Sequence, residues 1–272
     1  MPEKNKTLIV LAESQLFKTR SSDVVVSKLS EHTGIEEDTI NAKMRNEQVK
    51  GAMGGIFAGC FGSSCGFSSF INDYKKGEIG TDDFYEEFRD RLRLGSDQLS
   101  DDTIKDCWNS MCEFSEQAKT ESVNVARLLT KNKDTHIVFV NETNQLQHEE
   151  NFRQFKEALG EESFKQIKGQ IHFVNSHEIN SLGDKKRLAS EGVKVLQTSG
   201  QLPSNDQIES VVSLHKDMKS QSILDEGKNV STVRKNEGKF LDIKTNGESD
   251  MFQKIEESLK DIEKTKGLVT QR

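Results

Sequence analysis

A length of 272 residues leaves room for one α/β domain and a smaller insertion. Charged residues make up 31% of the chain and the net charge is −7, so the overall composition attracts neither nucleic acid nor an anionic membrane. Basic residues do not alternate with aromatic ones, which argues further against a nucleic-acid interface. The cysteines form two C-x4-C pairs, Cys60/Cys65 and Cys107/Cys112. On a helix this spacing places the thiols on different faces, so we expect reduced cysteines in a cytoplasmic protein rather than a zinc site.

The first predicted element is a buried strand over Thr7–Leu11, in which Thr7 is followed by four apolar residues. A helix follows, with Val24–Val26 and Leu29 on its apolar face. Residues 51–70 then carry no charge and include six glycines. The run is about as long as a bilayer span, but its glycines and serines make it weakly apolar. We therefore expect a closely packed helix or loop rather than membrane insertion.

Two helical patterns follow the glycine-rich run. Thr81 is predicted to cap a helix whose apolar face carries Phe84 and Phe88. Ser100 is predicted to cap a second helix that carries Trp108. No polar partner accompanies the tryptophan, which favours a place in the core over a ligand-binding role.

The remaining chain alternates short apolar runs with helical patterns. Strands are predicted at 136–140, 171–174, 210–214 and 240–243, and helices at 123–129, 149–168, 186–198, 218–236 and 251–264. Strands separated by helices indicate right-handed crossovers and a parallel sheet. Because ligands of such sheets bind at the carboxyl ends of the strands, function is expected there.

Three local patterns occur in the order found in haloacid dehalogenase-like hydrolases with a helical cap. Residues 76–84 and 107–111 resemble that branch's cap helices, 140–146 its second motif, and 182–186 its third. The resemblance implies a three-layer Rossmann-like α/β core with a parallel sheet, formed by residues 1–18 and 115–272. It also implies a small helical cap over 19–114, inserted after the first strand.

The resemblance also implies a set of catalytic positions. In the family, an aspartate at the end of the first strand attacks the substrate, and a second aspartate two residues later is the general acid and base. A hydroxyl and a lysine bind the transferred group, and acidic residues after the fourth strand hold Mg²⁺. In this order, the corresponding positions fall on Leu11, Glu13, Asn141, Lys186 (or Lys185) and Leu214-His215-Lys216, with Asp217 next.

Leucine has no lone pair, so it cannot replace the attacking carboxylate, and histidine or lysine in the acidic motif opposes Mg²⁺. We therefore predict a catalytically inactive protein that needs no cofactor and acts as a binding or regulatory module. Its partner is predicted to be another protein or a small anionic ligand. The candidate ligand-binding residues are Ser14, Asn141, Thr143, Asn144, Lys185, Lys186 and His215.

Three alternatives stay open. The first is a working hydrolase, such as a phosphatase, that uses Glu13, Lys186 and Asp217 with Mg²⁺. The second is a membrane-associated interaction protein, which rests on residues 51–70. The third is a bacterial secreted effector, because the acidic C-terminal helix resembles an export signal. His172, His177 and His215 are near predicted strand ends, where hydrogen-bonded histidines are expected more than a metal site.

Overall fold

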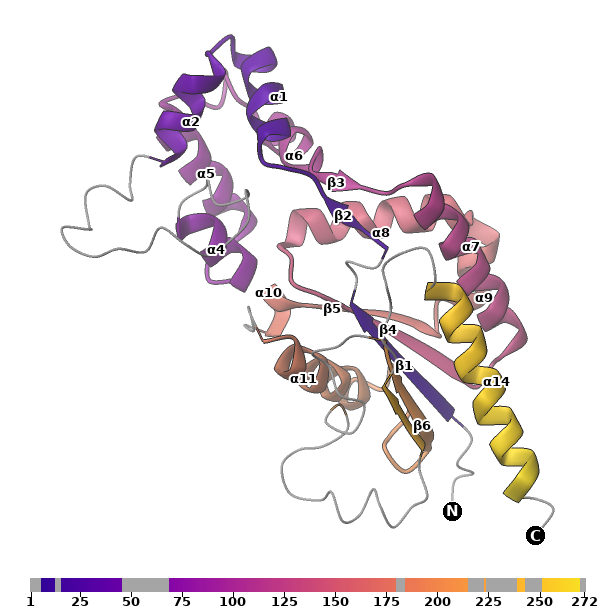
Figure 1. Ribbon diagram of the computed structural model, residues 1–272. Helices are drawn as coiled ribbons and strands as arrows, with labels where there is room; N and C mark the ends of the chain where they lie inside the picture. The colour runs from indigo at the N-terminus through magenta and orange to yellow at the C-terminus, as the bar shows by residue number, and fades with distance from the viewer. Residues whose placement is uncertain are drawn as a thin grey trace.

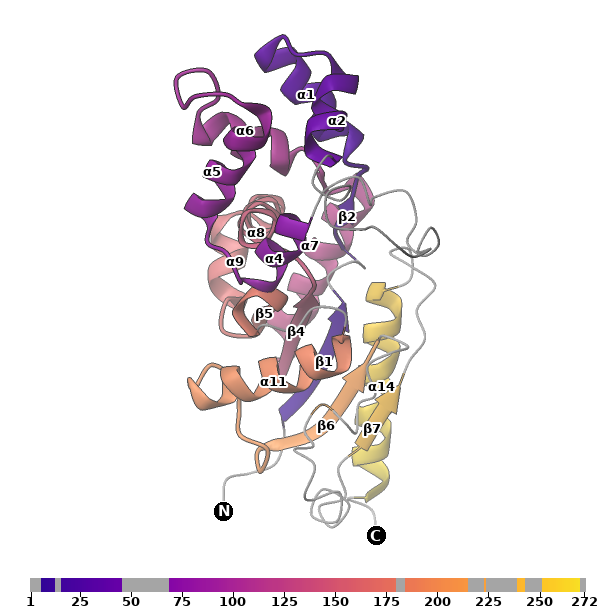
Figure 2. The same cartoon turned by 90° about the vertical axis from the view of Figure 1, so that its left-hand side faces the viewer.

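The computed structural model describes residues 6–12, 16–45, 69–179, 184–214, 223, 239–242 and 251–269, although some of their side chains, including those of Lys185 and Lys186, are not described. The chain builds a five-stranded sheet in the order β5-β4-β1-β6-β7, and all neighbouring strands are parallel (Figure 2). Its strands are β1 (Lys6–Ala12), β4 (Thr135–Asn141), β5 (Ile171–Asn175), β6 (Ile208–Ser213) and β7 (Lys239–Asp242). The predicted parallel sheet is confirmed.

Helices cover both faces of the sheet, because strand side chains alternate between two hydrophobic clusters. Ile9 and Leu11 of β1 face one cluster, which includes side chains of α7, α8, α9 and α14. Leu8 and Val10 face the other, which includes side chains of α11. The helices are α7 (Glu116–Lys131), α8 (Gln145–Leu159), α9 (Glu161–Ile167), α11 (Lys185–Thr198) and α14 (Met251–Val269). The three-layer arrangement is also confirmed.

The helices between β2 and β3 lie apart from the sheet (Figure 1). They contribute most of a third hydrophobic cluster, to which Leu146 of α8 also belongs. We call these helices the cap: α1 (Asp23–Thr33), α2 (Glu37–Arg45), α4 (Ser69–Lys76), α5 (Thr81–Leu92) and α6 (Asp101–Asn109). Trp108 is 1% exposed at its centre, with its ring 5.1 Å from that of Phe84. The antiparallel strands β2 (Lys18–Thr19) and β3 (Cys112–Glu113) connect the cap to the sheet. The division at residues 19 and 114 stays a prediction.

Two local expectations were wrong. The predicted helix over 149–168 is two helices, α8 and α9, because Gly160 has a φ of 74° that ends the first one. Thr81 does not cap α5. The N-cap residue of α5 is Gly80, and the Thr81 hydroxyl instead contacts Tyr74 and Gln145. Ser100 caps α6 as expected, accepting a hydrogen bond from the Thr103 N–H.

Two other expectations fall outside what the structure describes. Nearly all of the glycine-rich run lies there, as does nearly all of the predicted helix 218–236. Among the helices of the described part, none has the length and apolar character that a bilayer crossing requires.

Close packing of α11 against β5 depends on Gly192. A Cβ atom at this position would lie 2.1 Å from Cγ1 of Val174, and a strand valine has little rotamer freedom to move away. We predict that Gly192→Ala lowers the free energy of unfolding by about 1–3 kcal/mol, as overpacked cores do. Urea denaturation measures the change. Gly169→Ala is the matched control, because a Cβ there has no neighbour within 4 Å, and equal stability of the two variants would contradict the prediction.

Candidate functional site

A cavity of about 170 Å³ lies where the cap meets the carboxyl ends of β1 and β4. It is therefore at the sheet edge where parallel α/β folds bind ligands. Its walls come from β1, β2, α4, β3, β4 and α8, so cap and core both contribute. The lining residues are Ala12, Phe17, Thr19, Lys75, Cys112, Val140, Asn141, Glu142, Thr143, Gln147 and Asn151.

Two side-chain amides end the neighbouring strands β4 and β5. Asn141 and Asn175 are partners in the parallel register, so their side chains leave the same face of the sheet. The Nδ2 atom of Asn141 is buried and has no hydrogen-bond partner in the described part of the chain, and the same holds for both amide atoms of Asn175, which is 0% exposed. Buried amides of this kind require a water molecule or a ligand as partner. Asn141 lines the cavity, so the cavity can supply one.

A chain of buried hydrogen bonds runs behind the cavity wall. Asn144 is the N-cap of α8, and its Oδ1 accepts from the Gln147 N–H at 3.0 Å and from Nε1 of Trp108 at 3.3 Å. Asn144 Nδ2 then donates to Oε1 of Gln147 at 2.8 Å. The Thr143 hydroxyl donates to the same oxygen at 2.8 Å. The cap thereby contacts the residues that follow β4.

Further contacts hold the cap on the core beside this chain. The Tyr74 hydroxyl accepts from the Leu146 N–H at 3.3 Å, and its burial raises the pKa of the phenol to about 12. The Ser176 hydroxyl donates to the Lys75 carbonyl at 3.0 Å. Gly77 packs so closely on α10 (Ser176–Ile179) that a Cβ there would lie 2.3 Å from the His177 carbonyl oxygen. Cap and core thus meet through one buried and one partly buried hydrogen bond and through close packing at Gly77.

The sequence-predicted residues are only partly brought together. Asn141 and Thr143 line the cavity, and Asn144 lies behind it. Leu11 and Leu214 are 0% exposed in the hydrophobic cluster of the sheet, and the β1 residue at the cavity is Ala12. The resemblance places the nucleophile position on Leu11, but that side chain lies in the core rather than at the cavity, because side chains alternate along a strand.

The other predicted residues lie outside the description. Lys185 and Lys186 form the first turn of α11, capped by Asp184, but their side chains are not among the described ones. Glu13, Ser14, His215 and Asp217 lie outside the described residues entirely.

Sequence analysis missed several residues of the cavity wall. Gln147 had a detectable signal, since a glutamine three residues after an N-cap residue is a capping-box pattern. Asn151 lies one turn further along the same helix face. Lys75 had none, because it reaches the cavity from a helix of the cap.

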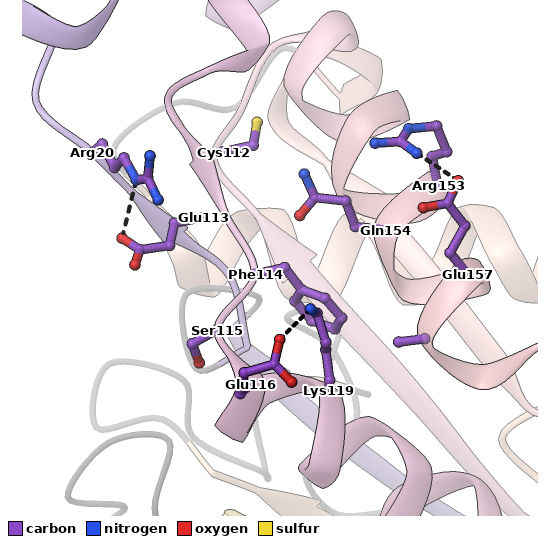
Figure 3. Close-up of a pocket in the computed structure, with 11 residues that line it drawn as sticks. Arg20, Cys112, Glu113, Phe114, Ser115, Glu116, Lys119, Arg153, Gln154 and Glu157 are labelled. Carbon is purple, nitrogen blue, oxygen red and sulfur yellow. Dashed lines mark hydrogen bonds and ion pairs between the residues drawn. The ribbon is translucent and has the colours of Figure 1, made fainter.

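A larger cavity of about 710 Å³ lies beside β3 and the start of α7 (Figure 3). Its charged side chains form ion pairs with each other: Arg20 with Glu113 at 3.5 Å, Lys119 with Glu116 at 2.5 Å, and Arg153 with Glu157 at 2.5 Å. A ligand would have to replace these contacts. The smaller cavity, with its unpartnered amide, is therefore the better candidate.

The smaller cavity does not fit Mg²⁺ by its described lining. Magnesium prefers carboxylates and other oxygen ligands in near-octahedral order. The described lining offers one carboxylate, Glu142, together with the ammonium group of Lys75. Within the described residues, no group of three histidine, cysteine, aspartate or glutamate side chains is placed to hold a metal.

Comparison with solved structures identifies the fold. A HAD family enzyme from Bacteroides thetaiotaomicron matches with a TM-score of 0.50 and 11% identity, over 93% of this chain and 99% of the other. The chain has a haloacid dehalogenase-like fold. The magnesium complex of that enzyme matches with a TM-score of 0.49 and 11% identity, over 92% and 97% of the two chains.

A predicted HAD-like hydrolase from Porphyromonas gingivalis gives a TM-score of 0.45 at 11% identity, over 93% and 98%. No model of a protein family matches the sequence, and no curated protein matches it. The likeness to HAD structures is thus one of fold, and the site has to be interpreted from its own residues.

A half-buried histidine, His136, and a buried one, His172, lie away from the cavity, near the amino ends of β4 and β5. Nδ1 of His136 is 3.4 Å from Nε2 of His172, and the rings stack. Burial lowers the pKa of His172 to about 4, with a smaller effect from His136. Burial also lowers the pKa of His136, helped by Lys6 and opposed by Asp134. Both rings are therefore neutral in the folded protein at pH 7.

This pair predicts acid destabilisation. Because the folded pKa of His172 lies below the unfolded value of about 6.5, the unfolded chain binds the extra proton first, and stability falls as the pH drops from 6.5 towards 4. His172 should contribute about 2 kcal/mol of the loss between pH 7 and pH 5. Urea denaturation at both pH values should show a smaller loss in His172→Gln than in the wild type. The exposed His32→Gln is the control, and equal pH dependence of all three proteins would refute the assignment.

Proposed function

We propose that this HAD-like chain is catalytically inactive and binds a small anionic ligand in the 170 Å³ cavity, as a binding or regulatory module. The observation that carries the proposal is the aliphatic end of β1. The last two residues of this strand are Leu11, which lies in the core, and Ala12, which lines the cavity. Neither side chain has an atom that attacks phosphorus or carbon.

Two placements of the family's nucleophile on β1 lead to the same conclusion. With the family's nucleophile placed on Leu11, the position holds a leucine in the core, and with the alignment moved by one it holds the alanine at the cavity. Removing the nucleophile from a well-studied hydrolase costs on the order of 10⁶ in turnover. Either placement therefore supports the loss of covalent catalysis.

Hydrogen-bond donors support the anionic ligand. Asn141 Nδ2 needs an acceptor, and Lys75 brings a positive charge to the same cavity. Glu142 offsets that charge, so the lining favours a ligand of low negative charge over a highly charged one. The volume suits a group of a few heavy atoms, because a water molecule takes about 30 Å³.

The alternative is a working hydrolase that uses Glu13, Lys186 and Asp217 with Mg²⁺. The HAD family enzyme from Bacteroides thetaiotaomicron was crystallised with magnesium and inorganic phosphate, which makes both the natural probes here. The inactive binding module and the working hydrolase differ in one measurable quantity, the rate at which the protein hydrolyses a phosphate ester.

We predict that the full-length protein with Mg²⁺ does not hydrolyse p-nitrophenyl phosphate above the rate of a protein-free control, because β1 supplies no nucleophile. Release of p-nitrophenol followed by absorbance measures the rate, and Glu13→Gln should give the same result. Turnover that disappears in Glu13→Gln would show that Glu13 acts in catalysis. That outcome would establish the hydrolase alternative in place of the proposal.

A further inference from the structure

The hydrogen bonds behind the cavity fix the orientation of the Gln147 side chain. Asn144 Oδ1 accepts from two groups that can only donate, the Gln147 backbone N–H and the Trp108 indole N–H. This atom must therefore be the oxygen of the amide, and the other atom of Asn144 must be its nitrogen. Because that nitrogen lies 2.8 Å from Gln147 and can only donate, the Gln147 atom facing it must be Oε1.

It follows that Gln147 turns its Nε2 away from Asn144 and Thr143. Gln147 is 4% exposed and lines the cavity, and its Nε2 has no hydrogen bond to another residue of the described chain. An amide nitrogen in such a place is a donor of fixed direction, held by a chain of bonds that begins at Trp108 of the cap.

We propose that Gln147 is a specificity-determining residue of the cavity, donating through Nε2 to an acceptor atom of the ligand. The inference rests on the proposed function and adds to it. The ligand must present one oxygen acceptor to Nε2 of Gln147 and a second to Nδ2 of Asn141. It must not present hydrogen-bond donors at these two points. An oxyanion such as phosphate or a carboxylate meets this requirement, and an ammonium group does not.

Two variants test the orientation, with inorganic phosphate as the probe and calorimetry at pH 8 as the measurement. Gln147→Glu keeps one oxygen to accept from Thr143 and Asn144 and places a second oxygen where Nε2 was. Asn144→Asp keeps the N-cap and the bond to Trp108, but its second oxygen repels Oε1 of Gln147 and favours the flipped amide. We expect each variant to bind phosphate at least about tenfold more weakly, the value of one hydrogen bond to a charged group.

Gln166→Glu is the matched control, since it makes the same charge change at an exposed position of α9 and should bind phosphate like the wild type. Wild-type affinity in either Gln147→Glu or Asn144→Asp would overturn the inference. No phosphate binding by the wild type itself would instead contradict the proposed anionic ligand.

Thermal unfolding is the folding control for both variants. Gln147→Glu places a carboxylate at a position that is 4% exposed, so burial of the charge alone lowers its melting temperature. A cooperative transition above the temperature of the calorimetry shows that the variant is folded and that its phosphate affinity decides the inference.

Discussion

The buried amide of Asn144 is the contact on which cap, helix and cavity all depend. The residue is 0% exposed, and its oxygen accepts one bond from α8 and one from Trp108 of the cap. Its nitrogen donates to Gln147 at the cavity wall. A buried amide whose oxygen and nitrogen are both hydrogen-bonded is stabilising, whereas one left unpaired costs about 1–3 kcal/mol. The folded chain therefore has a strong reason to keep the cap in this single position.

Further contacts between cap and core hold the walls of the cavity in place. Cap and core meet through the Tyr74 hydroxyl, the Ser176 hydroxyl and the close approach of Gly77 to α10. Hydrogen bonds and close packing of this kind resist sliding, because a small displacement weakens several contacts at once. The cavity walls from β4, α4 and α8 are therefore held in place before any ligand arrives. A ligand that enters such a cavity does not have to spend binding energy on arranging it.

Sequence patterns predicted the layers of the core much better than the cavity. Unbroken apolar runs such as Ile137–Val140 mark buried parallel strands, and their alternation with helices allows few topologies. The break at Gly160 was missed because the helical pattern continues across it, and a glycine inside a helix differs from a terminating one only in its φ angle. Asn141 and Thr143 were found because they follow a strand. Lys75 was not found, since its place at the cavity depends on how the cap packs against the core.

Catalysis at the end of β1 and ligand binding at the end of β4 require different side-chain chemistry. Attack on phosphorus requires a nucleophilic atom at one position, and an aliphatic side chain there cannot supply it. Binding requires donors at several positions, and each can be replaced by another donor with a modest loss. An asparagine can therefore stand where the HAD-like resemblance places a hydroxyl, and a glutamine oriented from behind can add a further donor. Under the proposed function, the cavity would bind an acceptor ligand beside a strand end that carries no atom able to react with it.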